Sequence, residues 1–217
     1  MLFLFSAILI LFTFSTLSSI SNTLNRLDVV ESERDRWQRP SDVIRSLGVS
    51  EGSTVVDLGS GAGYFTLKLA PVVCRRGEVL AVDLRRPSLF FLRIRALLQN
   101  QHNINIIVGT PDDPHLPTGR IDAVLISNTY HEFTNPRLML DYTWRSLRFG
   151  GRLVVLDRSQ TSRDSGEEQN YHHELPPEVV ISQLHQKGFE ILERQDRFID
   201  RPTGERWWLI VAEKPRK

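Results

Sequence analysis

The fold is decided by the stretch Thr54-Val55-Val56-Asp57-Leu58-Gly59-Ser60-Gly61-Ala62-Gly63-Tyr64-Phe65-Thr66. Its first five residues are mostly apolar or β-branched and predict a short buried strand over 54–58. Three glycines at alternate positions predict a tight turn, and apolar residues at helical spacing predict a helix over 64–74. A strand, a glycine-rich turn and a helix form the geometry in which a nucleotide-like ligand approaches bare backbone. One glycine would suffice for an ordinary turn, so three favour a ligand site.

The spacing of these glycines disfavours two common nucleotide sites. The dinucleotide fingerprint, G-x-G-x-x-G, would need glycine where Tyr64 or Thr66 stands. A P-loop needs the order Gly-Lys-Ser/Thr, and Lys68 is not placed for it. A dehydrogenase that binds a dinucleotide is therefore disfavoured.

The stretch instead resembles motif I of the class I S-adenosylmethionine-dependent methyltransferases, an acid followed by G-x-G-x-G. The matching residues are Asp57, Gly59, Gly61 and Gly63. The resemblance implies S-adenosylmethionine as the cofactor, with its ammonium group at the Asp57 carboxylate and its ribose and methionine parts at the open turn. It also implies a doubly wound, mostly parallel sheet of seven strands.

Asp83 is the next acid predicted to hold the cofactor. It ends a second buried strand over 77–83 and lies twenty residues beyond Gly63, the distance at which a βα unit returns to the same sheet edge. A carboxylate there could accept both ribose hydroxyls. The alternative is an acid that caps the following turn.

Two later loops supply further cofactor candidates. After a third strand over 103–108, the resemblance implies an acid that binds the adenine amino group, and Asp112 or Asp113 fills that place. Asn128, the first residue after a fourth strand over 121–127, is assigned to the cofactor as well.

The loop 128–133 is predicted to face the transferred methyl group, because ligands of open α/β sheets lie beyond the carboxyl ends of the strands. His131 is its only ionisable group whose usual pKa lies near neutrality. It is either a general base or a histidine that shapes the loop. Tyr130 beside it and Tyr64, which could shield the sulfonium, are the other catalytic candidates.

Several partner classes are disfavoured. Asn128 is followed by Thr129-Tyr130 and not by the Pro-Pro-aromatic box of adenine-N6 enzymes, and the loop lacks the Pro-Cys nucleophile of cytosine-C5 enzymes. The formal net charge of +1 gives no bulk attraction to a phosphate backbone. No metal site is predicted, since Asn128 alone is thin support for one. By elimination, the acceptor is a small molecule, a lipid or a quinone.

The remaining elements complete an α/β domain of the class I methyltransferase type. The 217 residues are enough for one such domain, and Cys74, the only cysteine, excludes an intramolecular disulfide and is predicted to be buried. The further predicted elements are a helix that begins at Pro136 and ends at Gly150-Gly151, a strand over 152–156, a helix over 177–187, and a C-terminal antiparallel hairpin of 189–198 with 206–213.

The polar segment 160–174 is interpreted as a lid on the acceptor side, because long loops in compact domains usually serve function. His173 is its predicted pocket contact. Asp157, just before this segment, either faces the acceptor or caps the turn.

The N-terminal segment is apolar and is followed by charge. Residues 1–24 hold no charged side chain and are predicted to be an uncleaved membrane anchor, with a cleaved signal peptide as the alternative. Residues 25–39 are predicted to be a charged linker, and 40–217 the catalytic domain. Arginines after the apolar segment favour a cytosolic domain, and signal cleavage would instead give a secreted or periplasmic one. The alternative function is a membrane-tethered module that binds the cofactor or a related nucleoside without turnover. The oligomeric state stays open.

Overall fold

The computed structural model describes residues 2–159 and 175–216. The chain divides into two compact units, Met1–Trp37 and Gln38–Lys217. The second unit begins two residues before the predicted start of the catalytic domain at residue 40.

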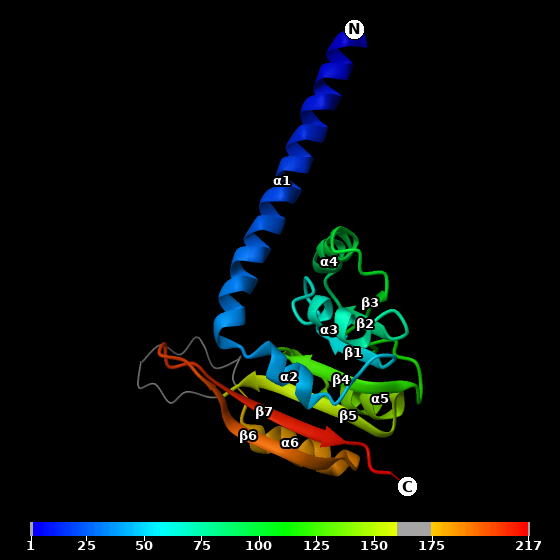
Figure 1. The fold of residues 1–217 in the computed structure, drawn as a ribbon, viewed down its shortest axis with the longest axis vertical. Helices are drawn as coiled ribbons and strands as arrows, with labels where there is room; N and C mark the ends of the chain where they lie inside the picture. The colour runs from blue at the N-terminus through cyan, green and yellow to red at the C-terminus, as the bar shows by residue number, and fades with distance from the viewer. Residues whose placement is uncertain (1, 160–174, 217) are drawn as a thin grey trace. The chain divides into compact units, whose positions relative to one another are not determined.

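The first unit is a single helix, α1, over Leu2–Trp37 (Figure 1). It runs on through residues 25–37, which were predicted to be a linker. The physical reason lies in the sequence: residues 2–38 contain neither glycine nor proline, and Glu33 and Arg36 pair at 3.6 Å one helical turn apart. In the part of the chain that the structure describes, no helix is both long enough and apolar enough to cross a membrane. The location of the protein stays a prediction.

The second unit is built on one sheet of seven strands in the order β3-β2-β1-β4-β5-β7-β6. The strands β1 to β5 are parallel to one another, and β7 runs antiparallel to β5 and β6. The predicted seven-stranded fold with a C-terminal hairpin is confirmed. The strands are β1 Thr54–Leu58, β2 Glu78–Asp83, β3 Ile104–Val108, β4 Ile121–Ser127, β5 Leu147–Arg158, β6 Glu190–Asp200 and β7 Arg206–Glu213.

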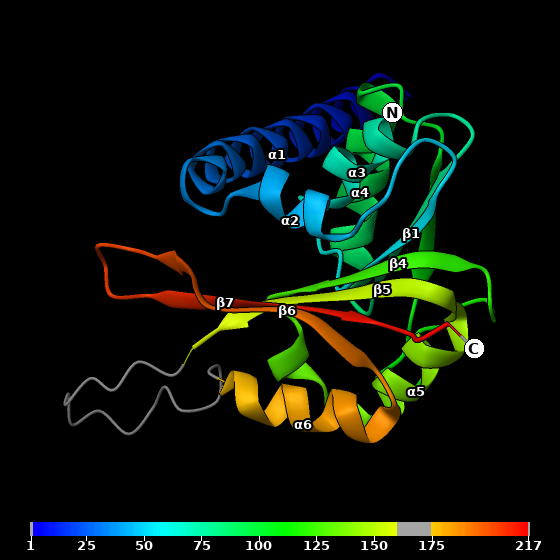
Figure 2. The ribbon, with the colours of Figure 1, turned by 60° about the horizontal axis from the view of Figure 1, so that its bottom comes forward.

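Helices cover both faces of this sheet (Figure 2). One face carries α2, α3 and α4, and the other carries α5 and α6. The central strands are buried on both sides, so they read as continuous runs of valine, leucine and isoleucine. The helices are α2 Pro40–Ser46, α3 Thr66–Val73, α4 Arg86–Leu98, α5 Pro136–Ser146 and α6 Pro177–Lys187, with a 3₁₀ turn η1 at Tyr130–Glu132.

The strand order reverses beside β1. From β1 the chain moves outward to β2 and β3 and then returns to β4 on the other side of β1. In open α/β sheets, such a reversal leaves a crevice at the carboxyl ends of the strands, where ligands bind. A ligand is therefore expected at the carboxyl ends of β1, β2 and β4.

Two local predictions were wrong. Gly150-Gly151 does not end a helix: α5 stops at Ser146, and both glycines lie inside β5 near a register shift opposite Ile121 and Ala123. Gly150 has φ of +73°, which suits such an irregularity. Cys74 is exposed, because it follows the last residue of α3 and lies on the turn that leads to β2.

Candidate active site

The glycine-rich turn is fixed to the neighbouring strand by its own backbone. The amides of Gly59 and Ser60 both donate to the Val82 carbonyl, at 2.8 and 3.0 Å. The Asp57 carboxylate is buried and accepts a hydrogen bond from the Thr66 hydroxyl at 2.6 Å. Asp57 thus holds the first residue of α3 in place, and its contact with the ammonium group of the cofactor stays a prediction.

The three glycines of the turn have positive φ but different surroundings. An added Cβ would overlap the Thr129 side chain at Gly59 and Leu92 at Gly63. At Gly61, where φ is +55°, an added Cβ would meet nothing within 4 Å. Gly59 and Gly63 therefore allow close packing, whereas Gly61 presents bare backbone to open space that a ligand could fill.

Asp83 links the end of β2 to this turn. Its Oδ2 accepts the Gly61 amide at 2.8 Å, and its Oδ1 accepts the Arg85 amide at 2.8 Å. The side chain is buried. Through the contact with Arg85, Asp83 does cap the turn that follows β2, as the alternative prediction stated. Asp83 Oδ2 retains a second acceptor position. Oδ1 also accepts Arg85 Nε at 3.5 Å, a contact of an exposed side chain that a ribose hydroxyl could replace.

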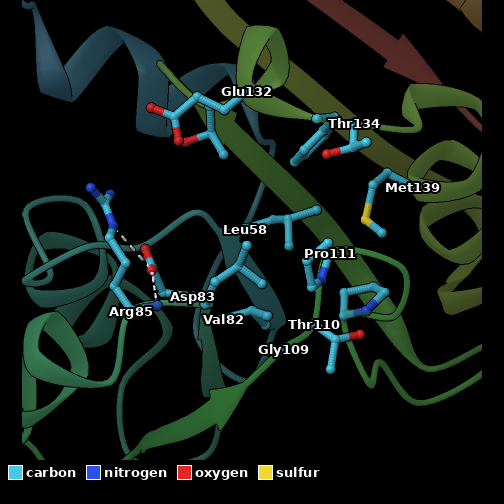
Figure 3. Close-up of a pocket in the computed structure, with 14 residues that line it drawn as sticks. Leu58, Val82, Asp83, Arg85, Gly109, Thr110, Pro111, Glu132, Thr134 and Met139 are labelled. Carbon is cyan, nitrogen blue, oxygen red and sulfur yellow. Dashed lines mark hydrogen bonds and ion pairs between the residues drawn. The ribbon is translucent and has the colours of Figure 1, made fainter.

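A cavity of about 210 Å³ opens beside Asp83 (Figure 3). Asp83 and Arg85 lie on one side of it, and Thr134 and Met139 lie on the other. Most of its wall is apolar, with a few polar groups, as is usual for small-molecule sites. A carboxylate next to apolar walls suits a nucleoside, whose sugar donates hydrogen bonds and whose base is flat. The lining residues are Leu58, Val82, Asp83, Leu84, Arg85, Gly109, Thr110, Pro111, Pro114, Thr129, Glu132, Phe133, Thr134 and Met139.

The loop after β3 contributes to this cavity, but not through its acids. Residues 109–111 line it, whereas Asp112 and Asp113 are not among the lining residues. Asp112 is exposed, and the Asp113 carboxylate accepts the His115 amide at 2.7 Å. Asp113 therefore folds its own loop, and an adenine contact from either acid stays a prediction.

The first residues after β4 are held by local hydrogen bonds. Asn128 has φ of +54°, and its side-chain oxygen accepts a hydrogen bond from Arg158 Nε at 3.0 Å. The Thr129 hydroxyl donates to the Ser127 carbonyl at 3.0 Å, and Thr129 lines the cavity. Of these residues Thr129 is therefore the one in the cavity wall, and Asn128 as a cofactor ligand stays a prediction.

His131 and Asp157 form a buried pair between η1 and β5. The Asp157 carboxylate accepts His131 Nδ1 at 2.8 Å and the His131 amide at 3.2 Å. Their side chains are 3% and 0% exposed. A carboxylate at Nδ1 places the proton there and fixes the ring, so that Nε2 is the nitrogen that could exchange a proton. The pair does not line the cavity, and the choice between base and structural histidine stays open.

The two tyrosines named as catalytic candidates lie in the interior. The Tyr130 hydroxyl donates to Gln183 Oε1 at 2.5 Å, and burial raises the pKa of this phenol above its usual range. Tyr64 is buried with its ring edge-on to Phe65, at 4.8 Å between ring centroids. Neither tyrosine is among the residues that line the cavity. Their catalytic roles stay predictions.

Sequence reasoning missed several residues that shape the site. Arg95 is buried and donates from Nη1 to the Ala62 carbonyl at 2.7 Å, which braces the glycine-rich turn from α4. A signal was present, because Arg95 stands on the face of α4 that carries Leu92 and Ala96. Arg85 and Glu132 had no such signal, since each is an ordinary polar residue in a loop or turn.

Two further predictions concern metals and the lid. Within residues 2–159 and 175–216, no group of three or more His, Cys, Asp and Glu side chains could hold a metal ion. The lid 160–174, with His173, lies outside the described residues.

Comparisons with known proteins agree with this geometry. A model of the ubiE/COQ5 methyltransferase family matches residues 13–176. The ubiquinone/menaquinone biosynthesis C-methyltransferase UbiE of Pasteurella multocida (strain Pm70) is 33% identical over 132 residues, which are 59% of this chain and 47% of that protein. The chain thus spans about half the length of the curated relatives it matches.

Solved structures show the same fold. A SAM dependent methyltransferase from Aquifex aeolicus superposes with a TM-score of 0.73 at 20% identity, covering 88% of this chain and 98% of that one. Geranyl diphosphate C-methyltransferase from Streptomyces coelicolor A3(2), solved with Mg²⁺, geranyl diphosphate and S-adenosyl-L-homocysteine, gives 0.67 at 15% identity, covering 82% and 80%.

Proposed function

Because the chain belongs to the ubiE/COQ5 methyltransferase family, we propose that it transfers a methyl group from S-adenosylmethionine to a ring carbon of a small, quinone-like acceptor. S-adenosylmethionine is the cofactor of this class of proteins. The acceptor and the transfer to carbon rest on the relatives, which are C-methyltransferases of ubiquinone and menaquinone biosynthesis. The lipid-like character of the acceptor rests on the apolar N-terminal segment.

One observation supports the proposal most directly. Gly61 leaves open space where a side chain would otherwise stand, and the Asp83 carboxylate lies next to it at the cavity wall. Asp83 would accept the ribose hydroxyls, and the apolar wall would hold the adenine ring. The apolar wall is formed by Leu58, Val82, Leu84, Pro111, Pro114, Phe133 and Met139.

The cofactor supplies an electrophilic methyl group when it is bound. The residues of this chain have to bind and orient the two reactants and exclude water, and alignment of this kind accounts for several kcal/mol of a transfer barrier. A ring carbon becomes nucleophilic when a neighbouring hydroxyl loses its proton, so a base near the acceptor would help. His131, fixed by Asp157, is our candidate for that base.

The membrane anchor at residues 1–24, with the domain on its cytosolic side, belongs to the same proposal. It would keep the domain close to an acceptor dissolved in a bilayer. A protein cleaved after a signal peptide would instead be secreted or periplasmic.

The proposal is tested in two steps. Calorimetric titration with S-adenosylmethionine, S-adenosylhomocysteine and NAD should show binding of the first two alone, and Gly61→Arg should abolish it. Incubation with S-adenosylmethionine and reduced, short-tailed benzoquinols or naphthoquinols should then give a methylated ring, seen by mass spectrometry. Tight cofactor binding without turnover of any acceptor would favour the non-catalytic module, and binding of NAD would overturn the proposal.

A further inference from the structure

The helix α4 exposes an apolar stripe that the domain does not cover. Phe90 is 51% exposed, Leu97 is 62% exposed and Leu98 is 72% exposed. The opposite side of the same helix packs on the sheet through Leu89 and Leu92. A helix on the surface of an α/β domain normally turns polar residues outward, and an outward stripe of large apolar residues marks an interaction surface.

Arginines stand within this stripe. Arg86, Phe90, Arg93 and Leu97 follow one another at intervals of four, three and four residues, so they lie along one side of the helix. Arg86 and Arg93 are exposed, and no ion pair or hydrogen bond within the described residues engages either one. Their charge is therefore available to a partner.

The charged residues in and around this helix are all positive. Between Asp83 and Asp112 the sequence has four arginines and no acidic residue, although the whole chain is nearly neutral at +1. Arg85, just before α4, pairs with Asp83 at 3.5 Å, whereas Arg95 is buried beneath the helix. An exposed helix that mixes arginine with phenylalanine and leucine has the chemistry of a helix that lies on an anionic bilayer.

This surface is continuous with the candidate active site. Leu84 and Arg85 connect β2 to α4, both line the cavity, and Leu84 is 52% exposed. The cavity therefore lies next to the N-terminal end of α4, where this surface begins.

We propose that the basic apolar face of α4, formed by Arg86, Phe90, Arg93, Leu97 and Leu98, docks the domain on a membrane surface that carries anionic lipids. The arginines bind the headgroups, and the apolar side chains enter the boundary between headgroups and acyl chains. The inference concerns binding alone and holds whether or not the acceptor is a lipid. It adds a second membrane contact that is separate from residues 1–24.

A local probe on the full chain tests this. In a Cys74→Ser background, Phe90→Cys carries an environment-sensitive fluorophore, and Leu192→Cys, an exposed apolar position on β6, carries the same label as the control. Vesicles with a third of anionic phosphatidylglycerol should shift the emission at position 90 to the blue and leave position 192 unchanged. Vesicles of phosphatidylcholine alone should have a weaker effect at position 90. Because the N-terminal segment is present in every sample, the difference between positions reports on α4.

Two matched charge variants complete the test. Arg86→Gln/Arg93→Gln should raise, about tenfold or more, the concentration of anionic lipid that gives half of the blue shift at position 90. Arg137→Gln/Arg145→Gln, which removes the same charge from α5 on the other face of the sheet, should not (Figure 2). Binding of S-adenosylhomocysteine should be equal in both variants, which shows that they are folded.

Three outcomes would overturn the proposal. One is an equal loss of the response at position 90 in both charge variants, which would mean that the vesicles attract positive charge anywhere on the protein. Another is no blue shift at position 90 with anionic vesicles. The third is a shift that grows with protein concentration in the absence of lipid, because a second copy of the chain would then cover this face.

Discussion

Replacing Asp83 by asparagine should separate the binding role of this carboxylate from its structural one. The amide has the same shape, but one of its two ends becomes a donor that faces a backbone N–H, since Asp83 accepts the amides of Gly61 and Arg85 at 2.8 Å each. We therefore expect a loss of about 1–3 kcal/mol in the free energy of unfolding. Hydrogen bonds to a charged group contribute about 1.5–3 kcal/mol each. If asparagine keeps one of two ribose contacts, S-adenosylhomocysteine should bind about 10- to 150-fold more weakly.

Calorimetry on both proteins with two ligands isolates the ribose contact. The second ligand is an analogue of S-adenosylhomocysteine that lacks both ribose hydroxyls. If Asp83 binds these hydroxyls, the mutation should weaken binding of the analogue much less than binding of S-adenosylhomocysteine. The thermodynamic cycle of two proteins and two ligands should then give a coupling energy of at least about 1 kcal/mol. Thermal unfolding, measured first, sets a temperature at which both proteins are folded. Additive effects of mutation and ligand change would refute the ribose assignment, however large the loss of affinity.

Three other changes test the remaining residues. Gly61→Ala should lower the free energy of unfolding by only about 1–2 kcal/mol, because of its positive φ, yet weaken S-adenosylhomocysteine binding more than tenfold. Gly59→Ala should lower the melting temperature more than Gly61→Ala does. A larger fall in melting temperature for Gly61→Ala would contradict our account of the turn. Tyr130→Phe should lower the free energy of unfolding by about 1–2 kcal/mol and leave kcat unchanged. Burial raises the pKa of the Tyr130 phenol, so its contribution to stability is present below the pKa of tyrosine in the unfolded chain, about 10, and is lost as the pH rises above that value. The variant should therefore lose less stability than the original protein at alkaline pH, which urea unfolding at several pH values would measure. Asp157→Asn should lower kcat at least tenfold, move the acidic limb of the pH–rate profile and change the ¹⁵N chemical shifts of the His131 ring. If the His131–Asp157 pair only supports the fold, the variant should lower the melting temperature and change none of the kinetic values.

The fold could be read from the sequence because its signals are local and agree with one another. The run Val55-Val56 is apolar on both faces, as a strand inside a parallel sheet has to be, and β4 spans Ile121–Ser127, the residues predicted for it. Gly150 misled the prediction because a glycine with positive φ serves a helix end and an irregular strand equally well. Only the pairing of β5 with β4, which is not local, decides between them.

The site was predictable to the level of its loops and less so to the level of its side chains. The sequence places Asp83 and Gly61 beside the ligand space because backbone geometry forces them there. It cannot say whether a polar side chain in a loop points into a cavity or bonds its own backbone. Asp113 bonds its own loop, and Tyr130 bonds Gln183, although both were candidates for direct contact.

The position of β7 has a consequence for synthesis of the protein. β7 follows β6 in the chain but lies between β5 and β6 in the sheet. While the ribosome is still making residues 206–213, β5 has an open edge and β6 has no strand on which to dock. A nascent chain therefore exposes the edge of β5 until β7 emerges, and synthesis proceeds at a few to about twenty residues per second. Chaperones that protect strand edges should therefore act on this chain until β7 is made. A stall before residue 206 should leave five paired strands, in the order β3-β2-β1-β4-β5, with β5 at an open edge.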